Sequence, residues 1–186
     1  FAASGRINAI AGAKQDSLGG DGGLAAKAKF NYIMCITLNP SGEKLHVADL
    51  KNRRIREIDL KSGKVRTIAG NGQRGVPKDG AKATEAPLVD PRAVCSDTAG
   101  NVYVLERGGH ALRVVRPDGR IYTVAGNGEK GNSDGRGSAA RFNGPKHICA
   151  DPAGNIYVAD DVNHLIRKYE PKTGEVSTVL GRGKVK

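Results

Sequence analysis

Residues 68–72 read IAGNG, the same motif returns as VAGNG at residues 124–128, and an incomplete copy, IAGA, occupies residues 10–13. Other landmarks recur with the same period of 54 to 58 residues, for example Phe30, Leu88 and Phe142. A fixed period of this length is the signature of a repeat architecture. The chain therefore contains three copies of one structural unit.

The third unit separates into four short runs that are apolar or alternate apolar with polar residues. These runs cover residues 146–150, 156–159, 164–169 and 175–180. Asp, Asn, Gly and Pro fill the intervals between them, and these residue types favour tight turns. Four short strands joined in this way form an antiparallel meander, and the other two units repeat the pattern. Each unit is therefore predicted to be one four-stranded sheet.

A single four-stranded sheet cannot cover both of its faces, so the three sheets must pack face to face around an axis. This predicts an all-β fold, a β-propeller with three four-stranded antiparallel blades plus one leading strand at residues 6–12. Residues 1–12 are assigned to the end of a preceding blade. The blades are placed at 30–70, 88–126 and 143–181, and Gly-rich connections at 13–29, 71–87 and 127–142.

The composition agrees with many short strands. Hydrophobic residues make up 38% of the chain, Trp is absent, and 26 glycines are available for turns. No apolar run approaches the ~20 residues of a membrane helix, so no membrane span is expected. The three cysteines lack metal-ligand spacing. Cys95 and Cys149 occupy the same place in successive units and are expected to be buried free thiols.

The chain carries 30 basic and 19 acidic residues, a formal net charge of +11. Such an excess favours attraction to polyanions, among them nucleic acids, anionic glycans and a bacterial envelope surface. An alternative interpretation is that the extra Lys and Arg residues only keep strand edges and loops soluble. Charge alone does not separate these interpretations.

Residues 151–168, DPAGNIYVADDVNHLIRK, resemble the NHL repeat. The matching positions in the third and first units are Asp160, Asn163, Ile166, Arg167, Asp49, Asn52, Ile55 and Arg56. The middle unit departs from the pattern, with Glu106 and Gly109 in place of Asp and Asn. The resemblance covers essentially all of the chain. It implies a propeller of NHL type in which the repeated acid and Arg are architectural, and an acid that closes the second strand can pair with an Arg on the third.

Propellers of this family usually have six blades, so the chain resembles half of a ring. Half a ring would leave an apolar sheet face uncovered at each end. The sequence therefore predicts either a homodimer that closes a six-bladed ring or the remainder of a longer chain that supplies the other blades.

Propellers bind ligands where the first strands begin and loops from adjacent blades converge. Alignment of the units puts Met34, Arg92 and Lys146 in one row of this mouth, and Cys35, Ala93 and His147 in the next. The family usually has Gly in the second row, so His147 is the sharpest departure. The predicted ligand-binding residues are His147, Lys146, Arg92, Met34 and Cys35. Alternatively, His147 is a hydrogen-bonded residue at a blade junction.

Catalysis by this segment has no support in the sequence. Peptidylglycine lyase propellers, which resemble NHL proteins, place a metal-binding His directly after the strand-opening Pro, where this chain has Arg92 and Lys146. Sugar-lactonase propellers need Glu, Asn and Asp around the channel, and the two rows offer none. We therefore expect no catalytic residues, no metal site and no cofactor in these residues.

The predicted function is that of a non-catalytic binding scaffold that recognises a protein, peptide or glycan at the channel mouth or the ring face. One alternative is an RNA-binding basic face, although Tyr103 and Tyr157 lie in strand centres where burial competes with base stacking. Another is a part of a propeller lyase or lactonase whose catalytic residues lie outside this segment. The run-on AGNG-type repeats resemble those of exported bacterial proteins, which implies a periplasmic or extracellular location.

Overall fold

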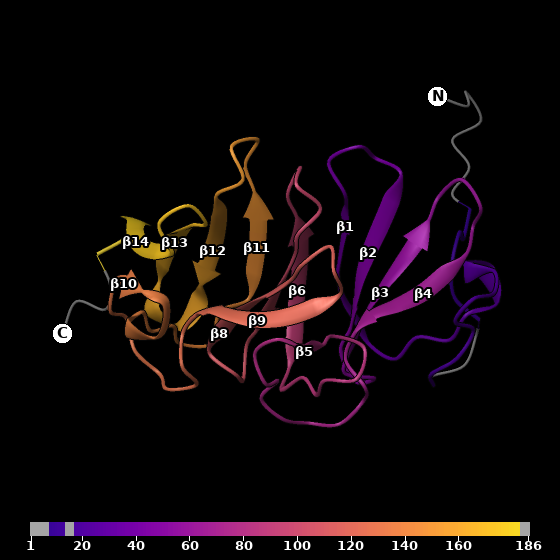
Figure 1. Cartoon of the computed structure of the whole chain (residues 1–186), viewed down its shortest axis with the longest axis horizontal. Helices are drawn as coiled ribbons and strands as arrows, with labels where there is room; N and C mark the ends of the chain where they lie inside the picture. The colour runs from indigo at the N-terminus through magenta and orange to yellow at the C-terminus, as the bar shows by residue number, and fades with distance from the viewer. Residues whose placement is uncertain (1–7, 14–16, 183–186) are drawn as a thin grey trace.

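The computed structural model describes residues 8–13 and 17–182, which form three antiparallel sheets arranged side by side in an arc (Figure 1). The predicted all-β propeller architecture is confirmed. In the first sheet the strands are β1 (Ile33–Leu38), β2 (Lys44–Asp49), β3 (Arg54–Asp59) and β4 (Val65–Ala69). The second contains β6 (Pro91–Ser96), β7 (Val102–Glu106), β8 (Ala111–Val115) and β9 (Arg120–Ala125). The third contains β11 (His147–Ala150), β12 (Ile156–Asp160), β13 (Leu165–Glu170) and β14 (Glu175–Leu180).

The connections contribute strands of their own to the sheets. β5 (Ala81–Lys82) pairs with β9, and β10 (Gly135–Arg136) pairs with β14, so the second and third sheets have five strands. Residues 22–25 take the corresponding place beside β4, with a bridge between Leu24 and Lys64. Each connection therefore lines the outer edge of the sheet that follows it in the chain. Three short 3-10 helices complete the described elements: η1 (Ala25–Lys27), η2 (Gly137–Ala139) and η3 (Asp161–Asn163).

The predicted leading strand is only partly within the described residues, since residues 6 and 7 lie outside them. Residues 8–13 have no strand assigned, because no earlier strand in the described part of the chain is available to pair with them. They nevertheless occupy the place of a strand end. The amides of Gly12 and Ala13 donate to the carbonyls of Ala25 and Ala28, at 2.9 and 2.7 Å. In the next unit, residues 70 and 71 make the same two hydrogen bonds to residues 83 and 86.

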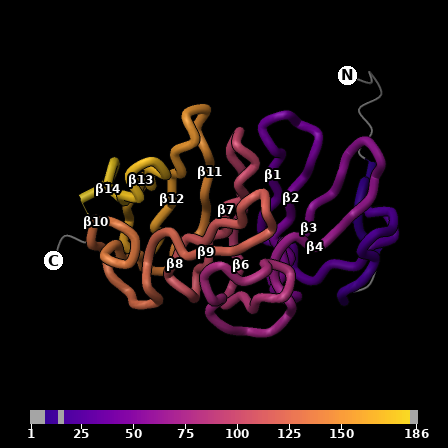
Figure 2. The backbone as a smooth tube through the Cα atoms, viewed as in Figure 1, coloured from indigo at the N-terminus to yellow at the C-terminus, as the bar shows by residue number. Residues whose placement is uncertain are grey.

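Successive sheets pack face to face, and one hydrophobic cluster runs through both junctions. At the first junction, the Cys35 thiol of β1 donates to the Val94 carbonyl of β6, with 3.8 Å between sulfur and oxygen. At the second, the rings of Tyr103 and Tyr169 lie 6.3 Å apart. A smaller cluster that includes Phe30 covers the other face of the first sheet. Figure 2 shows the N-terminal segment beside β3 and β4, on this side of the sheet.

The cysteines differ in exposure because their sheet faces differ in cover. All three are free, Cys35 and Cys95 are buried, and burial raises the pKa of both thiols. Cys149, expected to be buried like Cys95, is instead exposed. The third sheet covers the face that carries Cys95, whereas no sheet of the described residues packs on the face that carries Cys149.

The glycine of each AGNG motif is required by a close approach between strands. Gly126 has a φ of +82°, and a Cβ atom there would lie 2.2 Å from the His110 carbonyl oxygen. Gly70 stands in the same relation to the Arg53 carbonyl oxygen, at 2.0 Å. No side chain fits at that separation, so the motif that reveals the repeat in the sequence is kept by backbone packing.

Replacement of Gly126 by Ala should therefore destabilise the protein strongly. Gly119→Ala is a matched control, because Gly119 has a φ of +79° but nothing within 4 Å of the added Cβ atom. Both variants carry the strain of a positive φ, and only Gly126→Ala adds the clash. We expect Gly126→Ala to cost at least about 2 kcal/mol more of unfolding free energy than Gly119→Ala in urea titrations. Equal losses would contradict the close-approach explanation.

Candidate functional site

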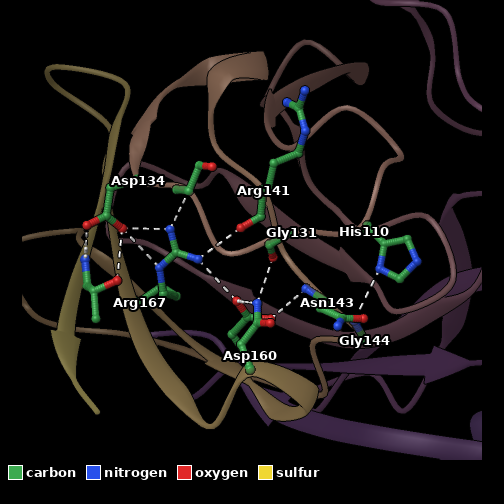
Figure 3. A network of polar contacts seen from close by, with 11 residues as sticks. His110, Gly131, Asp134, Arg141, Asn143, Gly144, Asp160 and Arg167 are labelled. Atoms are coloured by element: carbon green, nitrogen blue, oxygen red, sulfur yellow. Dashed lines mark hydrogen bonds and ion pairs between the residues drawn. The ribbon is translucent and has the colours of Figure 1, made fainter. Parts of the chain in front are cut away.

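A buried arginine on the third strand organises each sheet. In the third sheet, Arg167 Nη1 donates to Asp160 Oδ2 at 3.1 Å, and Nη2 donates to Asp134 Oδ1 at 2.6 Å (Figure 3). Nη1 also donates to the Arg141 carbonyl at 2.9 Å. Asp160 closes β12, whereas Asp134 and Arg141 belong to the preceding connection. The arginine therefore joins the sheet to that connection.

The same arrangement recurs in the other sheets with small changes. Arg56 contacts Asp49 Oδ2 at 3.4 Å and Asp21 Oδ1 at 2.6 Å. In the second sheet, Arg113 Nε donates to Glu106 Oε2 at 2.7 Å. Asp79 does not reach this arginine and instead accepts from the Thr123 amide at 2.7 Å. The predicted pairing of the acid with the third-strand arginine is confirmed. Each connection also contains an Asp followed by Gly, and this Asp accepts a hydrogen bond from the sheet that follows, a role that the sequence did not predict; the three residues are Asp21, Asp79 and Asp134.

The buried carboxylates of this network accept hydrogen bonds from several groups of the protein itself. Asp160 accepts from the Asn143 amide and the Asn163 side chain, each at 2.8 Å, in addition to Arg167. Burial raises the pKa of Asp160 and of its counterpart Asp49, although these hydrogen bonds oppose the shift. Each carboxylate is thus held by several donors of the protein itself, which agrees with the architectural role implied by the resemblance.

His110 belongs to the junction between the second and third sheets. Its Nδ1 accepts a hydrogen bond from the Gly144 amide at 3.1 Å, so this nitrogen carries no proton (Figure 3). Burial lowers the pKa of His110, and Lys130 and Arg107 act in the same direction. The lowered pKa favours the neutral form that this hydrogen bond requires.

The residues predicted to line the mouth are structurally equivalent, as their strand registers show. Cys35 pairs with Ala48, Ala93 pairs with Leu105, and His147 pairs with Ala159. Each of these second-strand partners directly precedes the acid that closes its strand. The first strands are also neighbours, because β6 contacts both β1 and β11. The structure thus brings the two rows to the starts of adjacent innermost strands.

The five predicted binding residues differ in their surroundings. Met34 and Arg92 are half-buried, and each lies where its strand has a register shift. Lys146 is exposed, and its Nζ lies 2.9 Å from Asp161 Oδ2. His147 is exposed, because no sheet of the described residues covers its side of β11. Cys35 occupies the equivalent position on β1 but is buried against the second sheet.

A groove that the sequence did not predict lies between the first and second sheets. A cavity of about 560 Å³ there is lined by side chains of both sheets, and an adjoining cavity of about 210 Å³ shares Lys44 and Glu57 with it. Glu57 is the centre of a polar cluster. His46 Nε2 lies 3.2 Å from its Oε2, and Arg66 Nε and Nη2 donate to its Oε1 at 2.9 and 2.7 Å. The signal in the sequence was that His46 aligns with Tyr103 and Tyr157 of the other units.

Glu57 stays ionised although it is buried. Burial by itself would raise its pKa, but hydrogen bonds from His46 and Arg66 and the charges of Arg66 and Lys44 lower the pKa to about 2. The side chain is only 8% exposed, so these contacts act with little screening by solvent. Among the described residues, no three His, Cys, Asp or Glu side chains are grouped in a way that could hold a metal ion.

The comparisons with known proteins agree with this geometry. The sheets and their repeated buried arginines define a segment of a β-propeller. Residues 142–169 match the family described as NHL repeat. The chain therefore carries an NHL repeat, and the predicted resemblance to NHL-type propellers is confirmed.

Three similar proteins illustrate the extent of the likeness. The chain is 31% identical over 153 residues to Protein SUPPRESSOR OF QUENCHING 1, chloroplastic, of Arabidopsis thaliana, an alignment that covers 78% of this chain and 14% of that protein. It is 39% identical over 99 residues to NHL repeat-containing protein 2 of Gallus gallus, covering 53% of this chain and 14% of that protein. A structural genomics protein of unknown function from Bacteroides thetaiotaomicron superposes with a TM-score of 0.62 at 24% identity, over 82% of this chain and 36% of that chain.

The chain thus spans 14% of the length of each of these two curated relatives. The likeness to the Bacteroides structure concerns the fold alone. In the part of the chain that the structure describes, no helix is long and apolar enough to cross a membrane.

The Glu57 cluster should make stability depend on pH in acid. The folded-state pKa of about 2 lies below the ordinary value of 4.5, so the stabilisation is complete above about pH 4.5 and is lost as the pH falls toward 2. The shift corresponds to a loss on the order of 3 kcal/mol. Urea unfolding of the protein and of Glu57→Gln between pH 6 and acid measures it. The difference in stability between the two should shrink as the pH falls, and a constant difference would contradict the assignment.

Proposed function

We propose that the chain is a non-catalytic binding segment of a propeller and that it recognises a protein, peptide or glycan where its first strands begin. The NHL-type fold supports a binding or scaffold role in general. The observation that carries the more specific proposal is the contrast between positions that repeat and positions that vary. The buried arginine is the same in all three units, whereas the row at the strand starts changes from Met34 to Arg92 to Lys146.

This contrast separates architecture from recognition. A position that serves packing needs the same chemistry in every unit, because each sheet meets its neighbour in the same way. The strand starts carry no such constraint, and two of the three present cations. Lys146 is exposed and forms a surface ion pair with Asp161, and His147 beside it is also exposed. Arg92, Lys146 and His147 therefore offer donors suited to the carbonyl, carboxylate or hydroxyl oxygens of a peptide or glycan.

Substitution of these three residues should abolish binding without affecting the fold. The probe is a microarray of defined peptides and glycans, read with the protein and with the variant Arg92→Gln, Lys146→Gln, His147→Ala. We expect the protein to select a restricted set of ligands and the variant to lose most of that signal.

A variant with a similar loss of charge provides the control. Lys61→Gln with Lys172→Gln removes two cations from exposed turns at the outer hairpins of the first and third sheets. Retention of selective binding by this control and its loss in the mouth variant support the proposal. Equal losses in both variants would assign the signal to net charge alone, and an unselective or empty array would count against this function.

One observation favours RNA as an alternative ligand. Tyr32 is 57% exposed just before β1, and Lys51 Nζ lies 5.4 Å from its ring centroid. An exposed aromatic ring beside a cation is the usual platform for an unpaired base. Tyr103, in contrast, is buried between sheets. Affinity for a single-stranded RNA oligonucleotide that falls steeply with salt, and that Tyr32→Ala weakens, would favour this alternative.

We also propose that a further blade of the same type covers the third sheet. Ile166 and Leu180 lie on its uncovered side, and Leu180 is exposed. Their equivalents in the second sheet, Leu112 and Ala125, are completely buried at a junction. Ile36 on the first sheet is 59% exposed, although Val94, its equivalent in the second sheet, is buried. Within the described residues, the first and third sheets therefore each expose one face, and the equivalents of these two faces are buried against each other at the two junctions between sheets.

A native mass spectrum distinguishes the two sources of such a blade. A complex of twice the 19.5 kDa chain mass would mean that a second copy closes the ring. Ile166→Glu should then shift the complex to monomer, while Lys172→Gln should not. A monomer for the unsubstituted chain would assign the missing cover to other blades of a longer protein.

The predicted exported location remains a prediction. The name of the plant relative places that relative in the chloroplast. The chain's net charge of +11 is compatible with the anionic surfaces that an exported protein meets.

A further inference from the structure

Two neighbouring positions at the mouth can be compared in all three units. One position is the row of strand starts, Met34, Arg92 and Lys146, and the other directly follows the acid that closes the second strand. In the third unit these positions hold Lys146 and Asp161, and Lys146 Nζ lies 2.9 Å from Asp161 Oδ2. The two positions are therefore close enough for their side chains to meet.

The chemistry of this pair of positions differs from unit to unit. The third unit has the ion pair, and the first unit has two apolar residues, Met34 and Leu50. The second unit has two cations, Arg92 and Arg107. Opposite charges attract and apolar side chains pack, whereas two like charges repel each other. Of the three units, only the second therefore has a pair that an anion between the side chains would stabilise.

The two arginines of the second unit have no acidic partner. Among the described residues, neither Arg92 nor Arg107 takes part in an ion pair. Asp90, which lies nearby in the sequence, instead accepts a hydrogen bond from the Gly108 amide at 3.1 Å. Arg107 Nε is buried without a hydrogen-bond partner. A buried donor of this kind is rare in folded proteins and calls for a ligand or bound solvent.

The Arg107 guanidinium lies where the second and third sheets meet. A Cβ atom on Gly144, two residues before Lys146, would lie 3.7 Å from Arg107 Nη2. The hydrogen bond from Lys146 lowers the pKa of Asp161, and the charge of Arg107 acts in the same direction. Arg107 is therefore close to the Lys146–Asp161 pair, but the acid of that pair is already held by Lys146.

We propose that Arg92 and Arg107 together bind a carboxylate group of a peptide ligand. Neighbouring guanidinium groups present N–H donors that match the two oxygens of a carboxylate, and the bound anion removes the repulsion between them. This inference rests on the proposed function, because it names the group that the ligand presents at the mouth. It adds Arg107, which is not among the binding residues predicted from the sequence.

The first unit supports a peptide as the source of the carboxylate. Met34 and Leu50 are half-buried and apolar, and the strands β1 and β6, which carry Met34 and Arg92, are in contact. An apolar surface beside a cationic one fits a peptide, since apolar side chains and carboxylates lie close together along one chain. A uronic acid would instead place hydroxyl groups on the apolar surface, where they lose hydrogen bonds to water.

Matched peptides test this inference. Each peptide that the array identifies is made in three forms: unmodified, with a C-terminal amide, and with every acidic side chain replaced by its amide. All are titrated by fluorescence anisotropy in about 0.15 M salt, which screens long-range attraction. The test variants are Arg107→Gln and Arg107→Asp, and the second of these gives the second unit the cation and acid of the third. Arg74→Gln is the matched control, because Arg74 is exposed in the connection between β4 and β5.

We expect one of the two amidated forms to bind at least about tenfold more weakly than the unmodified peptide, and which one it is identifies the carboxylate. Both Arg107 variants should bind the unmodified peptide as weakly as that amidated form, and Arg74→Gln should bind all forms as the unsubstituted protein does. Arg107→Asp should unfold at the same temperature as the unsubstituted protein or a higher one, because an ion pair replaces a repulsion.

The opposite outcomes separate this inference from the proposed function. Selective binding that neither amidated form weakens would overturn the carboxylate site and leave the proposed function intact, whereas an array without selective ligands would count against both. An equal loss with Arg74→Gln would assign the preference to net charge and overturn the site. A large fall in the unfolding temperature of both Arg107 variants would make Arg107 a structural residue. Selection of uronic-acid glycans in place of peptides would overturn the choice of a peptide.

Discussion

The buried guanidinium on the third strand of each sheet is the constraint on which the rest of the structure depends. A charge removed from water must be paired, and here its partners come from separate segments of the chain. The second strand supplies one acid in every unit, and in two of the three units the preceding connection supplies carbonyl oxygens and an aspartate. The same guanidinium lies over an aromatic ring in these two units, Phe30 for Arg56 and Phe142 for Arg167. In these two units, a sheet cannot separate from its connection without breaking the hydrogen bonds and the ion pair that hold this buried charge.

Because this scaffold is repeated, the three units act as controls for one another. Positions that keep their chemistry from unit to unit are explained by packing, and positions that change are free of that constraint. The strand starts and the His46, Glu57 and Arg66 cluster belong to the second kind. Fold likeness alone does not identify a function. Differences between copies of one unit point to function more directly, because all three units share the fold and the fold does not explain these differences.

The strands and their order could be predicted because their signals are local. Alternation, turn residues and the repeated glycine specify a meander without knowledge of its neighbours, and the acid and arginine of each unit could be paired from adjacent strands. β5 and β10 were missed, because a two-residue strand has no periodicity and forms only beside an existing edge. The exposure of Cys149 depends on whether another sheet covers its face. The groove needed knowledge of which side of β2 and β3 meets the second sheet. Each miss concerns contacts between segments that are distant in the sequence.

The pairing of each connection with the sheet that follows it also defines what one complete unit is. The repeated motif invites a division of the chain after each sheet, but a sheet cut away from the connection before it would lose its outer edge and, in the first and third units, partners of its arginine. The module that keeps these edge contacts together therefore begins with a connection and ends with the AG of the motif, as residues 71–126 do. A propeller of this kind can gain or lose blades only as whole modules, each a connection with the sheet that follows it. A duplication with other boundaries would separate a sheet from its connection and leave the outer strand of that sheet unpaired. The period of the sequence thus corresponds to the segment that must be duplicated as a whole, as well as to the spacing of the sheets.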